Sequence, residues 1–526
     1  MNYPHGVTEV YNPATLEKVG EVANTDLSRI PEFFANARIA QKHWAALSFK
    51  QRKPHLLKMR DYIVDHAEEL AEIVNKSNGK SRTDALITEV MPCALAADWY
   101  AKNAGKVLQP KKVSTSSILF LNKKSLIAHI PVGVVGIISP WNYPLSIPFG
   151  EVVMGLMAGN AIMLKVAATV PLVGEAIENI VAAGELPDGL FHHLVGSGGA
   201  ISTAFFEHNI GKIFFTGSVP VGKQLMAQAA ATLTPLSLEL GGKDPMVVLA
   251  DADLERAANG AAWAGYQNAG QSCGGVERIY VHESVYDEFV KLLAEKTKAM
   301  RHGVDRDFDV EMGSMTTQNQ LKTVQKHVES AVQSGAKIVA QSYAPNTEKG
   351  FFYPATLMID VNHDMEMMQE ETFGPVLPVM KFSTIEEAIT LANDCTMALT
   401  SSVWTRNTQL GKEIALKIEA GVTAINDHLY THALSETPWG GWKDSGLGRT
   451  HGAQGLAEMS HVKVVNWDIL PGVKRDLWWF PFDKATYNAI LTALRFAYPK
   501  SVGGYVSHGL KLMPFMLKKV FSVWKI

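Results

Sequence analysis

Cys273 is the residue whose surroundings most clearly suggest chemistry. It ends the segment QNAGQSC (267–273) and precedes Gly274 and Gly275, whereas structural cysteines usually lie among large apolar neighbours. Small neighbours leave the sulfur open to a substrate, and nearby backbone N–H groups can stabilise a thiolate or an oxyanion. The alternative is a buried, inert thiol, and this segment alone does not separate the two.

Glu239 is a candidate general base. It stands between Leu238 and Leu240 and is followed by two glycines and Lys243. A carboxylate between leucines is predicted to be desolvated, which raises its pKa and suits it to accept a proton. The alternative is a glutamate that ends a strand in a salt bridge, with Lys243 as its partner.

Asn142 lies in PWNYP (140–144), directly after the apolar run 132–139. The carboxyl ends of parallel strands are where α/β sheets bind ligands, so its amide is placed to donate a hydrogen bond to a developing oxyanion. Losing such a donor costs roughly 2.7–4 kcal/mol of transition-state stabilisation. The alternative is a loop stiffened by its prolines and anchored by Trp141.

Two glycine-containing turns are candidates for phosphate binding. Gly196-Ser197-Gly198-Gly199 follows one apolar run, and Phe215-Thr216-Gly217-Ser218 follows another. Each is predicted to open a helix, and the N-terminal amides of a helix can hold a pyrophosphate. Each signal is weak by itself.

The elements that must position these residues alternate between apolar strands and helices. Predicted strands at 132–139, 161–166, 190–196 and 212–217 are separated by helical stretches, a pattern typical of a parallel, doubly wound sheet. A second alternating region runs from 241 to 426, with strand candidates PMVVLA, RIYVH, AKIVA, VLPVMKF and TSSVWT. Residues 27–80 show helical periodicity, and the runs SILFL and SLIAHI within 117–129 predict a hairpin. The predicted fold class is α/β, with two doubly wound parallel-sheet domains.

The composition excludes several classes of protein. The 526 residues carry a formal net charge of −3, whereas a nucleic-acid binder is usually basic. Cys93, Cys273 and Cys395 are far apart and lack metal-ligand spacing, so no metal site or disulfide framework is predicted, and a reducing, cytoplasmic location is favoured. The sequence shows neither a signal peptide nor an apolar run of about 18 residues that could cross a bilayer.

Taken together, the motifs resemble the aldehyde dehydrogenase superfamily from about residue 10 to residue 465. PWNYP, FTGS, LELGGK, NAGQSC, EETFGPV (370–376) and PWGGWKDSGLGR (438–449) occur in the family's order and approximate spacing. The resemblance implies that Cys273 attacks an aldehyde to give a thiohemiacetal and then a thioester. Asn142 and the Cys273 backbone N–H would form the oxyanion hole, and Glu239 would activate water. The presence of Glu239 favours hydrolysis over transfer of the acyl group to coenzyme A.

The same resemblance implies a nicotinamide cofactor in a Rossmann-like domain. Lys165 would contact the adenosine ribose, and Glu371 the nicotinamide ribose. The other cofactor-binding candidates are Ser139, Trp141, Gly198, Gly217, Ser218, Leu240 and Phe373. Where the family often has KPxE, this chain has Lys165-Val166-Ala167-Ala168. Losing that glutamate removes a group that repels a 2′-phosphate, so NADP is compatible. We place NAD first because this loss does not create a phosphate pocket.

The resemblance also divides the chain. Residues 1–112 and 131–239 are predicted to form the cofactor-binding domain, and 240–430 the catalytic domain. Residues 113–130 and 431–465 would form a small β oligomerisation element, which implies a homodimer or homotetramer. A basic, aromatic C-terminal extension would occupy 466–526.

This extension has seven Lys or Arg residues and no Asp or Glu between 484 and 526. Three roles stay open: packing on a partner subunit, covering the substrate entrance, or peripheral contact with an anionic membrane. Pro514 and the Gly503-Gly504 pair are predicted to interrupt any single long helix here. The extension resembles those of relatives that act on long-chain fatty aldehydes.

The expected substrate is therefore a medium- or long-chain apolar aldehyde. A semialdehyde or betaine-aldehyde dehydrogenase is an alternative with the same chemistry and a different pocket. A non-catalytic structural protein on the same fold is a further alternative, disfavoured because Cys273, Glu239 and Asn142 are all present.

Overall fold

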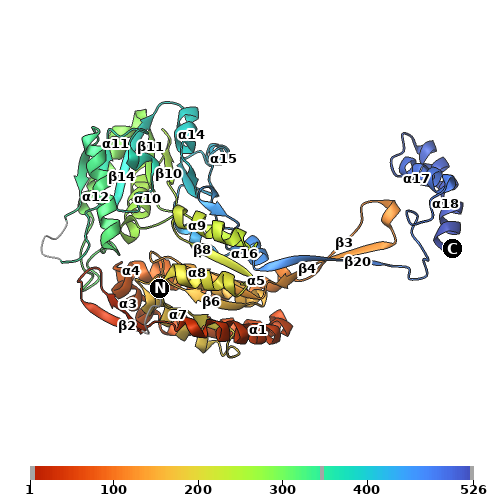
Figure 1. Ribbon diagram of the computed structural model, residues 1–526. Coiled ribbons are helices and arrows are strands. Elements are labelled where there is room, and N and C mark those ends of the chain that lie inside the picture. Colours follow the sequence, from red (N-terminus) through yellow and green to blue (C-terminus); the bar gives the residue numbers. More distant parts are fainter. Residues whose placement is uncertain (1–5, 344–348, 522–526) are drawn as a thin grey trace. The chain divides into compact units, whose positions relative to one another are not determined.

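The computed structural model describes residues 6–343 and 349–521 (Figure 1). The chain forms two compact units: one comprises residues 1–107 and 131–461, and the other residues 108–130 and 462–526. The first unit contains both candidate α/β regions, and each unit is described separately below.

The first unit begins with a hairpin and a group of helices. Ser48 and Gln51 form a reciprocal capping box at the start of the second long helix, and Gly79 ends the third in a left-handed conformation. The helices expected in residues 27–80 are confirmed. The elements are β1 (Val7–Tyr11), β2 (Lys18–Ala23), α1 (Ile30–Ala46), α2 (Phe49–Asp65), α3 (Ala67–Asn78), α4 (Arg82–Ala85) and α5 (Met91–Leu108).

A six-stranded sheet in the order β19-β9-β8-β5-β6-β7 follows. Its strands are parallel except for β19. The chain fills one side of β5 with β6 and β7 and the other with β8 and β9, so the strand order reverses beside β5, where such sheets bind ligands. The strands are β5 (Val134–Ile138), β6 (Ala161–Lys165), β7 (Phe191–His193), β8 (Lys212–Thr216), β9 (Leu236–Glu239) and β19 (Gly446–Leu447). The helices are α6 (Ser146–Ala158), α7 (Pro171–Ala183), α8 (Gly198–Glu207), α9 (Val219–Ala230) and α16 (Gly452–Glu458).

A seven-stranded sheet in the order β12-β13-β14-β11-β10-β16-β17 forms the second α/β region, and only β12 is antiparallel. In Figure 1 its strands lie among helices α10, α11 and α12. The predicted α/β fold class with two parallel-sheet domains is confirmed. The strands are β10 (Pro245–Val248), β11 (Arg278–His282), β12 (Lys337–Gln341), β13 (Thr356–Ile359), β14 (Val376–Phe382), β16 (Thr400–Trp404) and β17 (Val422–Ile425). The helices are α10 (Leu254–Tyr266), α11 (Tyr286–Ala299), α12 (Gln318–Gln333), α13 (Glu366–Gln369), α14 (Ile385–Asn393) and α15 (Thr408–Ala415). The short strands β15 (Met397–Ala398) and β18 (Trp442–Lys443) pair with each other.

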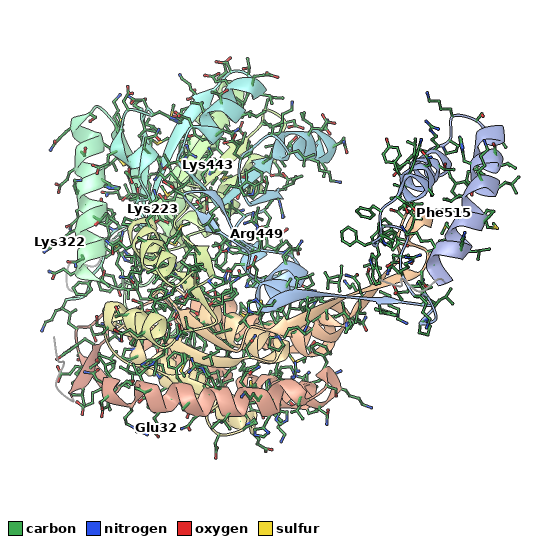
Figure 2. All side chains as sticks on the ribbon, turned by 45° about the vertical axis from the view of Figure 1, so that its right-hand side comes forward. Glu32, Lys223, Lys322, Lys443, Arg449 and Phe515 are labelled. Atoms are coloured by element: carbon green, nitrogen blue, oxygen red, sulfur yellow. The ribbon has the colours of Figure 1, made fainter. Side chains whose placement is uncertain are left out.

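The second unit contains a three-stranded sheet and two helices. The sheet has the order β20-β4-β3, and α17 packs against α18 around a small core of Leu477, Ala489, Ala493 and Leu512. Phe515 on α18 also packs against this core (Figure 2). The elements are β3 (Lys111–Val113), β4 (Lys123–Pro131), β20 (Ser460–Asp468), α17 (Lys484–Ala497) and α18 (Val502–Phe521).

Two local predictions in this second unit are wrong. The run SILFL is not a strand: Ile118–Phe120 forms a short 3-10 helix, stabilised where the Ser117 hydroxyl accepts a hydrogen bond from the Leu119 N–H at 3.3 Å. The partner of β4 is instead β3. Helix α18 also continues through Pro514. Proline has no N–H, so the helix loses the hydrogen bond to the Leu510 carbonyl. Leu510 lies on an exposed face, where water can hydrogen-bond to that carbonyl, and Leu512 packs into the small core on the opposite face.

Candidate active site

Cys273 follows a left-handed turn at the end of α10. Asn268, Ala269 and Gly270 have φ values of 52°, 53° and 71°, which non-glycine residues rarely adopt. A Cβ atom on Gly270 would lie 2.1 Å from the Gly374 carbonyl oxygen, so only glycine fits there. Backbone strain of this kind persists where the surrounding structure enforces it, and it is frequent at functional sites.

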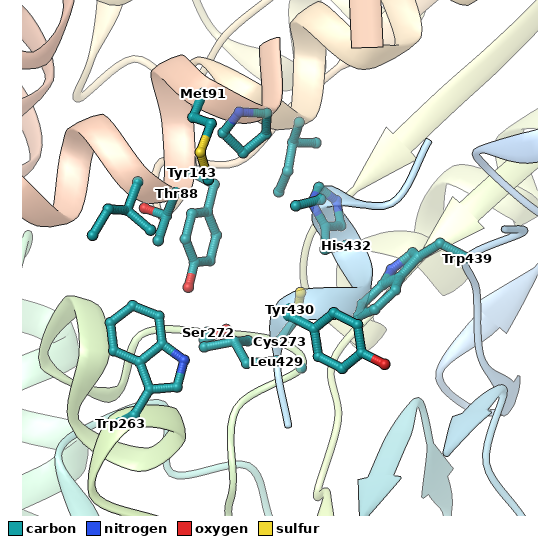
Figure 3. A pocket seen from close by; sticks show the side chains of 15 residues that line it. Thr88, Met91, Tyr143, Trp263, Ser272, Cys273, Leu429, Tyr430, His432 and Trp439 are labelled. Carbon is teal, nitrogen blue, oxygen red and sulfur yellow. The ribbon is translucent and has the colours of Figure 1, made fainter. Parts of the chain in front are cut away.

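Two cavities meet at Cys273. We name them the substrate pocket and the cofactor cavity in anticipation of their chemistry. The substrate pocket (Figure 3) is lined by Ile87, Thr88, Met91, Pro92, Tyr143, Ile147, Trp263, Ser272, Cys273, Gly274, Leu429, Tyr430, His432, Ala433 and Trp439. The cofactor cavity is lined by Pro140, Trp141, Asn142, Thr216, Gly217, Ser218, Leu240, Gly241, Cys273, Gln320, Thr323, Glu371 and Phe373. Molecules bound in the two cavities would therefore meet at this cysteine.

The environment of the Cys273 thiol raises its pKa. Burial is the largest cause, and the carboxyl groups of Glu371, Asp244 and Glu239 add to it when they are ionised. The thiol is therefore protonated at neutral pH in this state. Its position between two cavities is nevertheless unlike that of Cys93, which is buried in the core.

Glu239 ends β9 and is 5% exposed. Neither carboxylate oxygen has a hydrogen-bond partner among residues 6–343 and 349–521. Burial raises its pKa well above the ordinary value; the Glu151 carboxylate raises it further, and Arg449 opposes the rise. The alternative of a salt bridge with Lys243 is wrong, because Lys243 Nζ lies 2.6 Å from Glu277 instead. Glu239 lines neither cavity, but its carboxyl group, when ionised, raises the pKa of the Cys273 thiol.

Asn142 is buried, and its amide points toward the Cys273 loop. Its Nδ2 donates to the Gln271 carbonyl at 3.1 Å, and because a primary amide carries two N–H groups, a second donor is left. The Asn142 backbone carbonyl accepts from Lys80 Nζ at 3.0 Å and from Asn268 Nδ2 at 2.9 Å. This clamp fixes the loop relative to the nucleophile.

A buried ion pair supports that clamp, and sequence reasoning missed it. Lys80 Nζ lies 2.7 Å from Glu89 Oε1, and both side chains are fully buried. The other oxygen of Glu89 accepts from the N–H groups of Leu145 and Ser146 at the start of α6. No local motif marks either residue, since their charges are explained only by tertiary contacts.

Six of the nine predicted cofactor residues gather in the cofactor cavity: Trp141, Gly217, Ser218, Leu240, Glu371 and Phe373. The rings of Trp141 and Phe373 meet edge to face, with centroids 5.5 Å apart. Glu371 Oε1 accepts from the Gly242 N–H at 3.0 Å, and burial raises its pKa to about 8. Thr216 lies in the FTGS motif but was not itself predicted as a cofactor residue, and sequence reasoning missed Gln320 and Thr323, which no motif distinguishes.

The other three predicted residues lie at neighbouring strand ends and do not line this cavity. The Ser139 N–H donates to the Lys165 carbonyl at 3.0 Å, and a Cβ on Gly198 would lie 3.6 Å from Lys165 Nζ. Lys165 is 7% exposed, has no ion-pair partner in the described part of the chain, and burial lowers its pKa to about 8. A buried ammonium group without a counterion suits a polar ligand.

These residues fit a dinucleotide. Ser218 precedes α9 without a side-chain cap, so the N–H groups of the first turn other than at Pro220, which has none, are available to an anion. Lys165 lies on the neighbouring side of β5, and Glu371 and Phe373 lie in the cavity that reaches Cys273. These residues would hold the riboses and phosphates of the dinucleotide along the carboxyl edge of the sheet. Its nicotinamide ring would then lie beside the Cys273 sulfur.

The substrate pocket is mostly apolar. None of the described residues that line it is Lys, Arg, Asp or Glu. Its only titratable groups besides the thiol are the two tyrosines and His432, whose pKa burial lowers to about 4, so the imidazole is neutral. The lining comes from segments around residues 90, 145, 263 and 430, which explains why no single motif revealed it.

Comparison with known proteins places this arrangement in a family. The model of the aldehyde dehydrogenase family matches residues 3–465. The chain is 37% identical over 471 residues to a 4,4′-diapolycopene aldehyde oxidase of Methylomonas, covering 89% of this chain and 87% of the relative. It is 36% identical over 453 residues to a protein of Mycolicibacterium smegmatis with a provisional name as an NADP+-dependent succinate-semialdehyde dehydrogenase, covering 85% and 87%.

Solved structures agree. The NAD+ complex of an aldehyde dehydrogenase from Bacillus cereus superimposes with a TM-score of 0.83 at 33% identity, covering 88% of this chain and 94% of that one. An aldehyde dehydrogenase from Brucella melitensis gives a TM-score of 0.84 at 32% identity, covering 88% and 94%. With its fold, its motifs and a cysteine between two cavities, this chain belongs to the aldehyde dehydrogenase family.

Proposed function

We propose that this enzyme oxidises medium- or long-chain apolar aldehydes to carboxylic acids, with NAD as the first choice of cofactor. The observation that carries the substrate class is the pocket beside Cys273, which is lined by aliphatic and aromatic side chains and by no described charged group. An apolar chain gains free energy on entering such a pocket, whereas a carboxylate or ammonium would be desolvated without a partner.

The proposed reaction begins at Cys273. Its sulfur, after losing its proton to water, attacks the aldehyde carbon, and the resulting oxyanion accepts hydrogen bonds from Asn142 Nδ2 and the Cys273 backbone N–H. A nicotinamide bound in the cofactor cavity supplies the hydride acceptor. Loss of the hydride restores the carbonyl as a thioester on Cys273.

Glu239 would complete the turnover. In its ionised form it takes a proton from water, whose oxygen attacks the thioester carbon, and the carboxylic acid leaves as the sulfur regains its electron pair. The burial that raises the pKa of Glu239 makes it a stronger base once it is deprotonated.

A charged semialdehyde is the second candidate, because the Mycolicibacterium relative is named for succinate semialdehyde. Such a substrate needs a cation to pair with its carboxylate, and the described lining offers none. The Methylomonas relative is named for a long apolar aldehyde, which supports the first proposal.

A substrate panel tests the proposal. The value of kcat/KM is measured for propanal, hexanal, decanal and dodecanal beside succinate semialdehyde and betaine aldehyde, each with NAD and with NADP. Rising values along the apolar series support the proposal, and activity confined to the charged aldehydes refutes it. The same panel decides the cofactor: Ala168, exposed after β6, removes the usual obstacle to a 2′-phosphate without adding a partner for one.

We also propose that the enzyme is a homodimer or homotetramer. Strand β20 is an edge strand of the sheet β20-β4-β3, and all but its first residue are exposed, including Val462, Val464 and Trp467. A long, exposed apolar edge strand invites pairing with another chain. Light scattering after gel filtration tests the state, and a monomer at micromolar concentration contradicts the proposal.

We further propose that the enzyme is cytoplasmic and that its C-terminal extension makes peripheral contact with a membrane surface. Trp479, Phe480, Phe482 and Leu510 are each at least half exposed, and the segment after 484 is basic. No helix in the described part of the chain is long and apolar enough to cross a bilayer. Co-sedimentation with phosphatidylserine vesicles, compared between the full chain and one ending at Val465, tests the contact. Equal sedimentation of both chains argues against it and leaves packing on a partner or covering of the entrance.

A further inference from the structure

A second groove adjoins the substrate pocket. It is lined by Ile87, Ala262, Trp263, Met300, Phe308 and Val310, among others, and we name it the lateral groove. Ile87 and Trp263 line both hollows, and each of these two residues is 40% exposed. They form a ridge between the two hollows. A chain that leaves Cys273 and passes over this ridge enters the lateral groove.

The groove is also larger than the pocket. On the same measure its volume is about 330 Å³, against about 130 Å³ for the substrate pocket. An apolar substrate that fills the pocket therefore still finds space beyond the ridge. The groove belongs entirely to the first unit of the chain.

The charged groups of the groove already have partners. The Arg301 guanidinium is paired with Glu311, with Nε 2.7 Å from Oε1, and Asp84 accepts from the backbone N–H of Asn268 at 2.9 Å. A polar ligand would find few free partners there. The apolar side chains are what the groove offers.

Phe308 shows this most clearly. The side chain is 63% exposed although it is a large aromatic, and its backbone has a left-handed φ of 58°. The guanidinium carbon of Arg82 lies 3.9 Å from the ring centroid, while Arg82 itself is paired with Asp305 at 3.0 Å. The ring is thus held from one side by a cation and leaves its remaining surface to solvent. Together with the other apolar side chains of the groove, the ring offers an apolar surface beside the pocket, and such exposed apolar patches can mark ligand-binding grooves.

We infer that the lateral groove is a subsite for the distal part of a long apolar aldehyde. The carbonyl end lies at Cys273, the chain crosses Ile87 and Trp263, and its far end lies against Met300, Val310 and Phe308. This inference rests on the proposed function, because it presupposes an apolar aldehyde in the substrate pocket. Continuity with that pocket is what identifies the occupant. The groove would make this enzyme selective for chain length.

The consequence is measurable. Burying one methylene improves binding about fourfold, so kcat/KM should keep rising with chain length after the pocket is full. Short aldehydes end before the ridge, so changes in the groove should not alter their kcat/KM. A change in the groove should therefore act on long substrates alone.

The experiment measures kcat/KM for hexanal, decanal and tetradecanal with Phe308→Ser and Val310→Glu. The control is Leu416→Ser, which removes an apolar side chain that is even more exposed than Phe308 (89% against 63%) and lines neither hollow. We expect the values for hexanal to stay within about twofold for all variants. For tetradecanal, each groove variant should lose about tenfold or more, since several methylenes lose apolar contact, and the control should lose nothing.

Four outcomes decide between the two proposals. Full retention of tetradecanal activity in both groove variants overturns the subsite, and so does an equal loss on hexanal and tetradecanal, which would indicate general damage. A wild-type enzyme whose kcat/KM does not rise between hexanal and tetradecanal also overturns the subsite, whereas only activity confined to charged aldehydes overturns the apolar substrate class. A selective loss on tetradecanal supports both.

Discussion

Replacing Glu239 by glutamine separates the two halves of the proposed reaction. The two side chains have nearly the same shape, and neither oxygen of Glu239 has a described hydrogen-bond partner that the change would remove. The new amide brings N–H donors into the same buried place, and an unsatisfied buried donor costs about 1–3 kcal/mol of folding free energy. The protonated acid already present there carries a similar penalty, so the net loss of stability should be small.

The effect on turnover should be large. A positioned general base contributes about 10²–10⁴-fold, and glutamine cannot accept the proton of water. Thioester hydrolysis should slow by about that factor. Attack by Cys273 and hydride transfer do not require Glu239 to take a proton from water, so the first turnover should proceed almost at the wild-type rate.

Stopped-flow absorbance of the reduced cofactor distinguishes these steps. We expect a burst near one equivalent per active site, followed by a steady state slower by about two to four orders of magnitude. Thermal unfolding of the variant serves as the control for folding. If the burst and the steady state slow by the same factor, Glu239 assists the first half-reaction and the assigned role is wrong.

Three further predictions concern the same site. Cys273→Ala should abolish aldehyde oxidation while binding of the cofactor, followed by fluorescence titration, persists; retained turnover would remove the nucleophile from the scheme. Asn142→Ala should lower kcat/KM about 10²–10³-fold by removing an oxyanion donor, and a loss below about threefold would assign the oxyanion to other donors. The rate of thioester hydrolysis should rise with pH through the raised pKa of Glu239, because only its ionised form is a base. Burial raises the pKa of Glu151 to about 8, and above that pH its charge raises the pKa of Glu239 further; Glu151→Gln removes this charge, so the rise should move to lower pH, and an unmoved profile would show that Glu151 does not act on Glu239.

The sequence was sufficient to predict the architecture because parallel sheets bury both faces. Their strands appear as continuous apolar runs, as at 134–138 and 245–248. The signal fails where it depends on distant partners. The run SILFL has strand composition, but a serine hydroxyl turns it into a short 3-10 helix, and Pro514 lies within a helix because packing on α17 compensates for one lost hydrogen bond.

The site shows the same division. Motifs identified the residues that approach Cys273 from the strand ends, since each is fixed by a local strand-to-loop geometry. They could not identify Lys80 and Glu89, whose buried pairing is what holds the Asn142 loop in place. They also could not identify the ridge residue Trp263. In the sequence it is one apolar residue of an amphipathic helix, and only the folded structure places it between the two cavities.

The carboxylates around Cys273 lead to a last prediction. Glu371, Asp244 and Glu239 raise the pKa of the thiol together with burial, so in the free enzyme it should react slowly with iodoacetamide at neutral pH, and the rate should keep rising above the ordinary thiol pKa of about 8.5. A positive charge in the cofactor cavity lowers the thiol pKa by the same Coulombic argument. Oxidised nicotinamide carries such a charge, so NAD+ should accelerate alkylation of Cys273. NADH has a similar shape but lacks the charge, and it therefore controls for blocked access to the sulfur.

The assay follows modification of Cys273 by mass spectrometry, with Cys273→Ser giving the background from half-buried Cys395. Faster alkylation with NAD+ than with NADH at pH 7 would mean that the nucleophile becomes reactive only when the hydride acceptor is in place. Fast, pH-independent alkylation of the free enzyme would contradict the electrostatic argument, because it would require a thiolate that these three carboxylates and the buried setting should suppress.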